Sequence, residues 1–175
     1  MTAKPGNKPA SCTTQEVEAF RTFMRAHALL VGAIEQDLAA AELPPLAWHD
    51  VLATLDAAPE GRMRIHELAD AIVFSRSGLS RLLDRLEREE LLRRERSPND
   101  RRGAYAVLTD SGRATLDQMS AVYRRTVDEH FLPHLGDEVE ALKTSLERVS
   151  DSAREACPID AASLAPAGPS SAPRR

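Results

Sequence analysis

The residues best suited to bind an anionic partner lie in the stretch SPNDRRGAYAVLT, residues 97–109. Asp100, Arg101 and Arg102 come directly before Gly103, in a segment whose composition favours a turn between two strands. Adjacent arginines on such a hairpin would present guanidinium groups, which bind phosphates and base edges. Asp100 can hold Arg102 in one orientation through a charge-assisted hydrogen bond. We therefore predict a charged hairpin that contacts a polyanion.

A second set of basic residues lies on a helix predicted over about 76–90, just before the hairpin. Leucines at 79, 82, 83 and 86 form one apolar stripe, so that a face rich in Ser and Arg remains exposed. Ser75 can cap the helix, and arginines in its first turns can bond to guanine in a major groove or to phosphates. An ordinary solvated face with ion pairs such as Asp84 to Arg88 is the alternative. The candidate contact residues are Ser75, Arg76, Ser77, Gly78, Ser80, Arg81 and Arg85.

The elements around these residues follow the order of a winged helix-turn-helix. A short strand candidate at 62–64 and a helix over 65–72 come first, and the arginine-bearing helix and two strands, 91–96 and 104–109, follow. A helix in one groove places the hairpin over the neighbouring minor groove, whose negative potential attracts guanidinium groups. The candidate contact residues of this wing are Arg94, Arg96, Asp100, Arg101 and Arg102.

Long helices are predicted on both sides of this unit. The first runs from about 14 to 42, the second from 111 to 131, and the last from 137 to 155, after an interruption at Pro133. Apolar residues recur at alternating three- and four-residue spacing in the first and last helices, which is typical of a narrow helix-to-helix seam. We expect a dimer joined through these helices, although they could also pack within one subunit. The seam residues are Val17, Phe20, Met24, His27, Val31, Ile34, Leu38 and Ala41 in the first helix and Val139, Leu142, Leu146, Val149 and Ala153 in the last.

The predicted fold class is mainly α with a small β-hairpin wing (α+β), a winged helix-turn-helix with terminal dimerisation helices. The predicted segments are a disordered arm (1–12), an N-terminal dimerisation helix (13–44), the DNA-binding domain (45–112), C-terminal dimerisation helices (113–156) and a disordered tail (157–175).

Composition narrows the class of protein. The 175-residue chain has a formal net charge of −4, yet residues 61–113 hold 12 Arg against 9 Asp and Glu, a net charge of +3. Such asymmetry can mark a basic binding face on an acidic body. No signal peptide, membrane span, catalytic motif or phosphate-cradling glycine loop is present in the sequence. We expect a cytoplasmic protein that is no enzyme, needs no cofactor or metal, and binds no membrane.

The stretches LADAI and SGLSRLLDRLEREELLRRERSPNDRRGAYAVLTDSG resemble the multiple-antibiotic-resistance regulator (MarR) family of bacterial winged-helix transcription factors. This resemblance covers about 14–155, including the D-R-R tip and the Leu-Thr-x-x-Gly that follows. It implies a homodimer that binds a pseudo-palindromic operator, usually as a repressor, with Arg102 as the minor-groove residue. One departure is Glu90, where members commonly have glycine; a helix-favouring residue there is expected to shift the helix end.

The resemblance also implies release from DNA by a small molecule, often an aromatic acid or phenol, or by cysteine oxidation. The ligand candidates lie between the dimer helices and the DNA-binding unit: Arg21, Met24, His27, Trp48 and His49. His27 and Trp48 could equally be core residues. Oxidation sensing through Cys12 is an alternative, although nothing nearby would lower its thiol pKa. A zinc site at His130 and His134 is disfavoured by Pro133. A winged-helix module that binds protein and not DNA is the remaining alternative.

Overall fold

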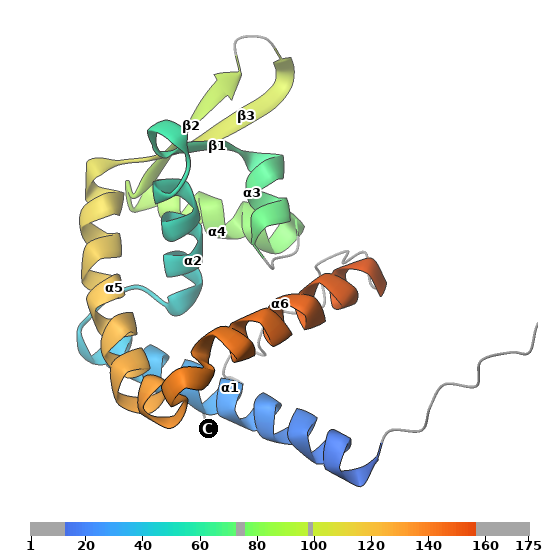
Figure 1. Ribbon diagram of the computed structural model, residues 1–175. Coiled ribbons are helices and arrows are strands. Elements are labelled where there is room, and N and C mark those ends of the chain that lie inside the picture. The colour runs from blue at the N-terminus through green and yellow to red at the C-terminus, as the bar shows by residue number, and fades with distance from the viewer. Residues whose placement is uncertain (1–12, 73–75, 98–99, 157–175) are drawn as a thin grey trace, which may run out of the picture.

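The computed structural model describes residues 13–72, 76–97 and 100–156, and the arm, the tail and Ser75 of the predictions lie outside these ranges. The described chain is mainly helical with one small antiparallel sheet, as predicted. Figure 1 shows the β2–β3 hairpin projecting at one end of the molecule and α1 and α6 extending from the other. The elements are α1 (Thr14–Ala40), α2 (Leu46–Asp56), η1 (Pro59–Gly61), β1 (Arg62–Arg64), α3 (Ile65–Ala71), α4 (Arg76–Arg88), β2 (Leu92–Ser97), β3 (Asp100–Leu108), α5 (Asp110–His130), η2 (Leu132–His134), η3 (Gly136–Glu138) and α6 (Val139–Ala156).

The sheet contains β1 as well as the predicted hairpin, in the order β1-β3-β2. β3 pairs with both neighbours in antiparallel register, for example Tyr105 with Arg64 on one side and with Glu95 on the other. Because side chains alternate across a strand, Leu92, Ala106 and Leu108 share the face that is buried. The opposite face carries Tyr105 and the charged side chains of its neighbours.

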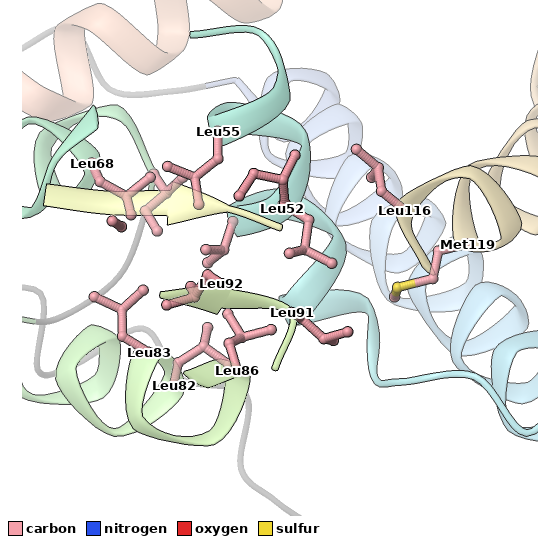
Figure 2. Packing of buried hydrophobic residues seen from close by; sticks show 14 of the residues in the cluster. Leu52, Leu55, Leu68, Leu82, Leu83, Leu86, Leu91, Leu92, Leu116 and Met119 are labelled. Atoms are coloured by element: carbon pink, nitrogen blue, oxygen red, sulfur yellow. The ribbon is translucent and has the colours of Figure 1, made fainter. Parts of the chain in front are cut away.

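Leucines hold together the part of the chain from α2 to β3, residues 46–108, which we call the wing lobe. Leu52 and Leu55 of α2, Leu68 of α3, and Leu83 and Leu86 of α4 are all fully buried. Figure 2 shows them converging with Leu92 of β2. Burial of one such side chain contributes about 1.5–3 kcal/mol. The predicted apolar stripe of α4, Leu79, Leu82, Leu83 and Leu86, is therefore confirmed as the buried face of that helix.

α4 ends two residues earlier than the predicted 90, because Glu90 adopts a left-handed conformation with φ 58°. The Leu91 N–H donates to the Leu86 carbonyl (2.9 Å) and the Glu90 N–H to the Glu87 carbonyl (3.1 Å). This pattern is a Schellman motif, in which the left-handed position usually holds glycine. The helix therefore ends as it would with a glycine at position 90, and Glu90 adopts a backbone conformation that its residue type disfavours.

The start of α1 is capped by Thr13. The Glu16 N–H donates to Thr13 Oγ1 (3.2 Å), and the Thr13 N–H donates to Glu16 Oε2 (2.7 Å). The bond from the Thr13 N–H favours the charged carboxylate and so lowers the pKa of Glu16, and the Thr13 side chain adds to this shift. At the other end α1 stops at Ala40, before the predicted 42, since Glu42 is also left-handed, with φ 56°.

The terminal helices α1, α5 and α6 are buried only in part. Ile34 and Leu38 of the predicted α1 seam are buried, while Phe20 is 62% exposed. Val149 on α6 is 61% exposed. α5 joins α1 through an ion pair from Arg125 to Asp37 (2.9 Å), which raises the pKa of Arg125. Among the described residues, no helix is both long and apolar enough to span a membrane.

Candidate nucleic-acid interface

Three stripes of side chains run along α4. The leucine stripe is buried and fixes the rotation of the helix against the wing lobe. Ser80, Asp84 and Glu87 form a second stripe at i, i+4 and i+7. Arg81, Arg85 and Arg88 form a third, and all three are exposed. Of the other predicted contact residues, Gly78 is half-buried in the first turns, Arg76 and Ser77 begin the helix, and Ser75 lies outside the described ranges.

The Leu-Thr-x-x-Gly motif forms the joint between the wing and α5. Thr109 Oγ1 accepts from the Gly112 N–H (2.9 Å), capping α5, and donates to the Glu90 carbonyl (2.7 Å). The Thr109 N–H donates to the Leu91 carbonyl (3.2 Å). A Cβ on Gly112 would overlap the Leu91 carbonyl oxygen. The motif therefore ties the end of α4, the start of β2 and α5 together, and its glycine is required by close packing.

The tip of the wing differs from the predicted hairpin. β3 begins at Asp100 and not at 104, because Asp100 pairs with Ser97 while Arg96 pairs with Ala104. Residues 101–103 therefore have no counterpart in β2 and form a bulge. Bulges bend a strand and increase its twist. The backbone of Arg101 and Arg102 thus lies in this bulge, next to the turn, while Arg96 is exposed just before it.

Arg94 has intramolecular partners that sequence reasoning missed. Its guanidinium lies 2.7 Å from Asp84 Oδ1 and 3.1 Å from Glu87 Oε2. Asp84 is thus paired across to β2, and not to Arg88 along the helix as the alternative interpretation expected. The structure therefore turns Arg94 toward α4. A contact between Arg94 and DNA stays a prediction.

The opposite face of the sheet carries a cluster that the sequence did not suggest. Arg62 and Arg64 of β1 place their guanidinium groups 4.2 and 5.2 Å from the centre of the Tyr105 ring. Glu95 pairs with Arg93 (3.0 Å) and lies 4.0 Å from Arg62. The Arg-x-Arg of β1 was the one sequence pattern that could have indicated this cluster. The pattern does not show that the arginines lie beside Tyr105, because that depends on the register between β1 and β3.

Comparisons with known proteins agree with this architecture. A family model described as MarR family matches residues 43–103. AbsC, a MarR family transcriptional regulator from Streptomyces coelicolor, has a crystal structure that matches with 32% sequence identity and a TM-score of 0.76. The match covers 83% of this chain and 98% of AbsC. The chain belongs to the MarR family.

Two further relatives support the assignment. Sco3205, a MarR family transcriptional regulator from S. coelicolor whose crystal structure was determined in complex with DNA, is 29% identical with a TM-score of 0.74, over 91% of this chain and 97% of Sco3205. The HTH-type transcriptional regulator MhqR of Bacillus subtilis (strain 168) is 29% identical over 96 residues, or 55% of this chain and 66% of MhqR. The chain spans 51–66% of the length of the curated relatives that it matches. These MarR-family relatives are transcriptional regulators and not enzymes.

The five predicted ligand residues of this MarR-family chain lie in two groups. Arg21, Met24 and His27 lie on the exposed N-terminal half of α1, where Arg21 lines a shallow groove with other α1 residues. Trp48 and His49 lie on α2 and are half-buried, with Trp48 packed against the main core. Within one subunit the structure does not gather the two groups at one site, and their role in ligand binding stays a prediction.

His49 lies in a polar contact between α2 and α5. Its Nε2 is 3.2 Å from Ser120 Oγ, and its ring stacks on Tyr123 with centroids 5.0 Å apart. Among the described residues, Nδ1 of His49 is buried without a hydrogen-bond partner. Ser120 and Tyr123 were absent from the predicted ligand residues, because the 71-residue separation of His49 and Ser120 leaves no local signal.

Metal binding has no cluster to support it in the part of the chain that the structure describes, where no three His, Cys, Asp or Glu side chains come together. His130 ends α5 and His134 lies in the following turn, after Pro133. Cys12 and Cys157 lie outside the described ranges.

Proposed function

We propose that this chain is a sequence-specific DNA-binding transcriptional regulator that reads an operator as a homodimer. The observation that carries the proposal is the arginine stripe of α4, which is held outward by a buried leucine stripe and lies beside a projecting wing. The DNA complex of Sco3205, a relative of similar fold, supports the same use of this architecture here. The rival interpretation, a module that binds protein and not DNA, is not favoured by these relatives.

The face of α4 between Arg76 and Arg85 enters the major groove in this proposal. Arginine suits the role because its planar fork can bond to both O6 and N7 of guanine. Ser77, Gly78 and Ser80 have side chains short enough for close approach to the phosphate backbone. The buried leucines prevent rotation of α4, so that the same side chains face the DNA in every molecule.

The wing then lies over the adjacent minor groove. The backbone of Arg101 and Arg102 lies in the bulge near the start of β3. A narrow minor groove concentrates negative potential and attracts an inserted guanidinium. In the proposal the guanidinium of Arg102 enters the minor groove and the carboxylate of Asp100 orients it. Arg96 contacts a phosphate of the DNA backbone.

A homodimer is supported by the apolar surface of α1 and α6. Phe20 and Met24 are 62% and 48% exposed on α1, and Phe131, Val139, Leu142 and Leu146 line an apolar groove along α6. Contiguous apolar rows rarely remain exposed to solvent on a monomer. A second copy would cover them and give the two α4 helices the two-fold arrangement that a pseudo-palindromic operator requires. The segment boundaries that follow are 13–44 and 113–156 for dimerisation and 45–112 for DNA binding.

Repression with release by a small aromatic or phenolic ligand is the finer part of the proposal. Its support is the contact between α2 and α5, where His49, Ser120 and Tyr123 combine aromatic surface with polar groups. A ligand that separated these two helices would change the placement of the wing lobe on the dimer. A thermal-shift screen of aromatic acids tests this part, since a ligand that binds the folded state raises its melting temperature. Action in the cytoplasm accords with this function and stays a prediction.

The experiment that tests the proposal is a binding titration with the DNA upstream of the protein's own coding region. Arg81→Ala should cost about 1–3 kcal/mol and relax specificity at one position, as expected for loss of a base contact. Arg102→Ala should weaken binding and reduce the slope of log affinity against log salt by about one. Arg124→Ala, at an exposed position on α5, is the matched control and should leave affinity unchanged. Unaltered affinity in both test variants would contradict the assigned roles.

A further inference from the structure

The structure points to a clamp between the wing and α4, built around Arg94. The Arg94 guanidinium contacts Asp84 Oδ1 at 2.7 Å and Glu87 Oε2 at 3.1 Å. Its Nη2 lies 3.4 Å from the Ser80 carbonyl oxygen, and its backbone N–H donates to Glu87 Oε1 at 3.0 Å. One side chain of β2 is thus bonded to three successive residues of one stripe on α4, and Glu87 holds both its backbone and its guanidinium.

The clamp lies between the two elements that would contact DNA. α4 and β2 are joined through Glu89, Glu90 and Leu91, so that the helix and the strand diverge from a short connection. The Schellman motif fixes them at that end, and the Arg94 contacts fix them farther along. With both points fixed, the angle between the arginine stripe of α4 and the wing has little freedom. The side chain of Arg94 is 29% exposed, the lowest value among these ion-paired groups.

The clamp also has an electrostatic consequence. Asp84 and Glu87 lie on the stripe next to Arg81 and Arg85, and two uncompensated carboxylates there would repel a phosphate backbone. Arg94 places one positive charge between them, with charge-assisted bonds to both. Because its donors are engaged within the protein, Arg94 is poorly placed to bond to phosphate as well.

We propose that Arg94 is a positioning residue for DNA recognition, one that sets the angle of the wing relative to α4 and neutralises Asp84 and Glu87 without contacting DNA itself. This inference rests on the proposed DNA-binding function. It assigns Arg94 a role different from that of Arg102 on the same wing, and the two roles predict different salt dependence.

The test is a titration of operator and scrambled duplexes over a series of salt concentrations. R94Q should bind the operator about tenfold more weakly, within the range of coupling energies for contacting charged residues. Its affinity for scrambled DNA should fall by a smaller factor, because only the repulsion by Asp84 and Glu87 acts there. Its slope of log affinity against log salt should stay at the wild-type value, whereas Arg102→Ala lowers the slope by about one. The melting temperature, measured in parallel, separates this loss of specificity from unfolding.

A mutant cycle gives the second arm. In the D84N/E87Q background Arg94 has lost its two carboxylate partners, so that adding R94Q should change operator affinity by less than about twofold. If R94Q does not fold, R94K replaces it in both arms, since lysine keeps the charge but loses the planar fork. R96Q is the comparison, because Arg96 lies two residues farther along the same face of β2, is exposed and is a proposed phosphate contact. R96Q should lower the slope by about one in both backgrounds.

Two results would overturn the clamp while leaving the proposed function intact. One is a slope reduced by about one in R94Q, as expected for a residue that contacts phosphate. The other is an equal loss of affinity in the wild-type and D84N/E87Q backgrounds. If the wild-type protein itself does not prefer operator over scrambled DNA, the proposed function fails, and the role of the clamp in DNA recognition fails with it.

Discussion

The wing lobe and the terminal helices bury their apolar residues to very different degrees. In the wing lobe Leu52, Leu55 and Leu83 are completely buried within one chain. In the terminal helices an equally regular apolar row leaves Phe20 more than half exposed. The core of the lobe continues into Ile34 and Leu38 of α1 and Leu116 and Met119 of α5, whereas other apolar residues of α1 and α6 remain exposed within one chain. In the proposed dimer the buried core serves folding and the exposed apolar residues of α1 and α6 serve assembly, so that substitutions in the two regions should fail in different ways.

The largest effect is expected from Gly112→Ala, at the joint between the wing lobe and α5. The new Cβ would overlap the Leu91 carbonyl oxygen and lie 2.8 Å from Leu108 Cδ1. Backbone and buried side chain would both have to move, which should cost about 3 kcal/mol or more. Denaturant unfolding monitored by circular dichroism measures the loss.

Gly32→Ala is the control for this substitution. Gly32 is also helical, but a Cβ there meets nothing within 4 Å. Alanine should therefore stabilise α1 by up to about 1 kcal/mol. Equal destabilisation by the two substitutions would refute the close-packing explanation of Gly112.

The second effect concerns the terminal helices. Phe20→Asp should weaken dimerisation about 100-fold, as loss of a buried aromatic contact does at an interface, while the wing lobe stays folded because Phe20 is exposed within one chain. Sedimentation velocity over a dilution series measures association, and circular dichroism checks the fold. Gln36→Asp, on the opposite side of α1, is the control and should remain dimeric. A Phe20→Asp dimer as tight as the wild type would disprove the seam assignment.

A smaller effect is expected at the end of α4. Glu90 has φ 58°, a conformation that costs a non-glycine residue about 1–2 kcal/mol. Glu90→Gly should therefore raise the free energy of unfolding by about 1 kcal/mol, after allowance for the greater flexibility of the unfolded chain. Glu89→Gly, one residue earlier and outside the left-handed region, should lower it. Thermal unfolding of both variants measures these changes. A Glu89→Gly variant more stable than Glu90→Gly would contradict the strain argument.

The smallest effect is expected at the start of α1. Hydrogen bonds to Thr13 lower the pKa of Glu16 in the folded chain, so this group stabilises α1 at neutral pH. That contribution is lost as the pH falls through the lowered pKa. Glu16→Gln should therefore reduce helicity slightly at pH 7 and make no difference in strong acid, as circular dichroism across pH would reveal. A difference that grows toward low pH would contradict this linkage.

Features set by local periodicity could be predicted from the sequence. The leucine spacing in α4 predicted which face of that helix is buried, because a helix repeats every 3.6 residues whatever its surroundings. The helix predicted over 111–131 matches α5 within one residue at each end. These features need no knowledge of distant contacts.

Features set by register and by tertiary contact could not be predicted. Arg94 was read as an exposed wing residue, since its bonds to Asp84 and Glu87 depend on how β2 folds back along α4. The start of β3 was placed four residues late, because the pairing of Ser97 with Asp100 leaves a bulge that no spacing indicates. Glu90 was expected to shift the helix end, yet the Schellman bonds hold it in a conformation its type disfavours.

The measurement that most directly tests whether the chain reads DNA as a dimer is a salt series of affinities for operator and scrambled duplexes, with the number of bound chains determined. We predict a steep negative slope of log affinity against log salt, a clear preference for operator, and two chains per site. Equal affinity for both duplexes, or one chain per operator, would contradict the account.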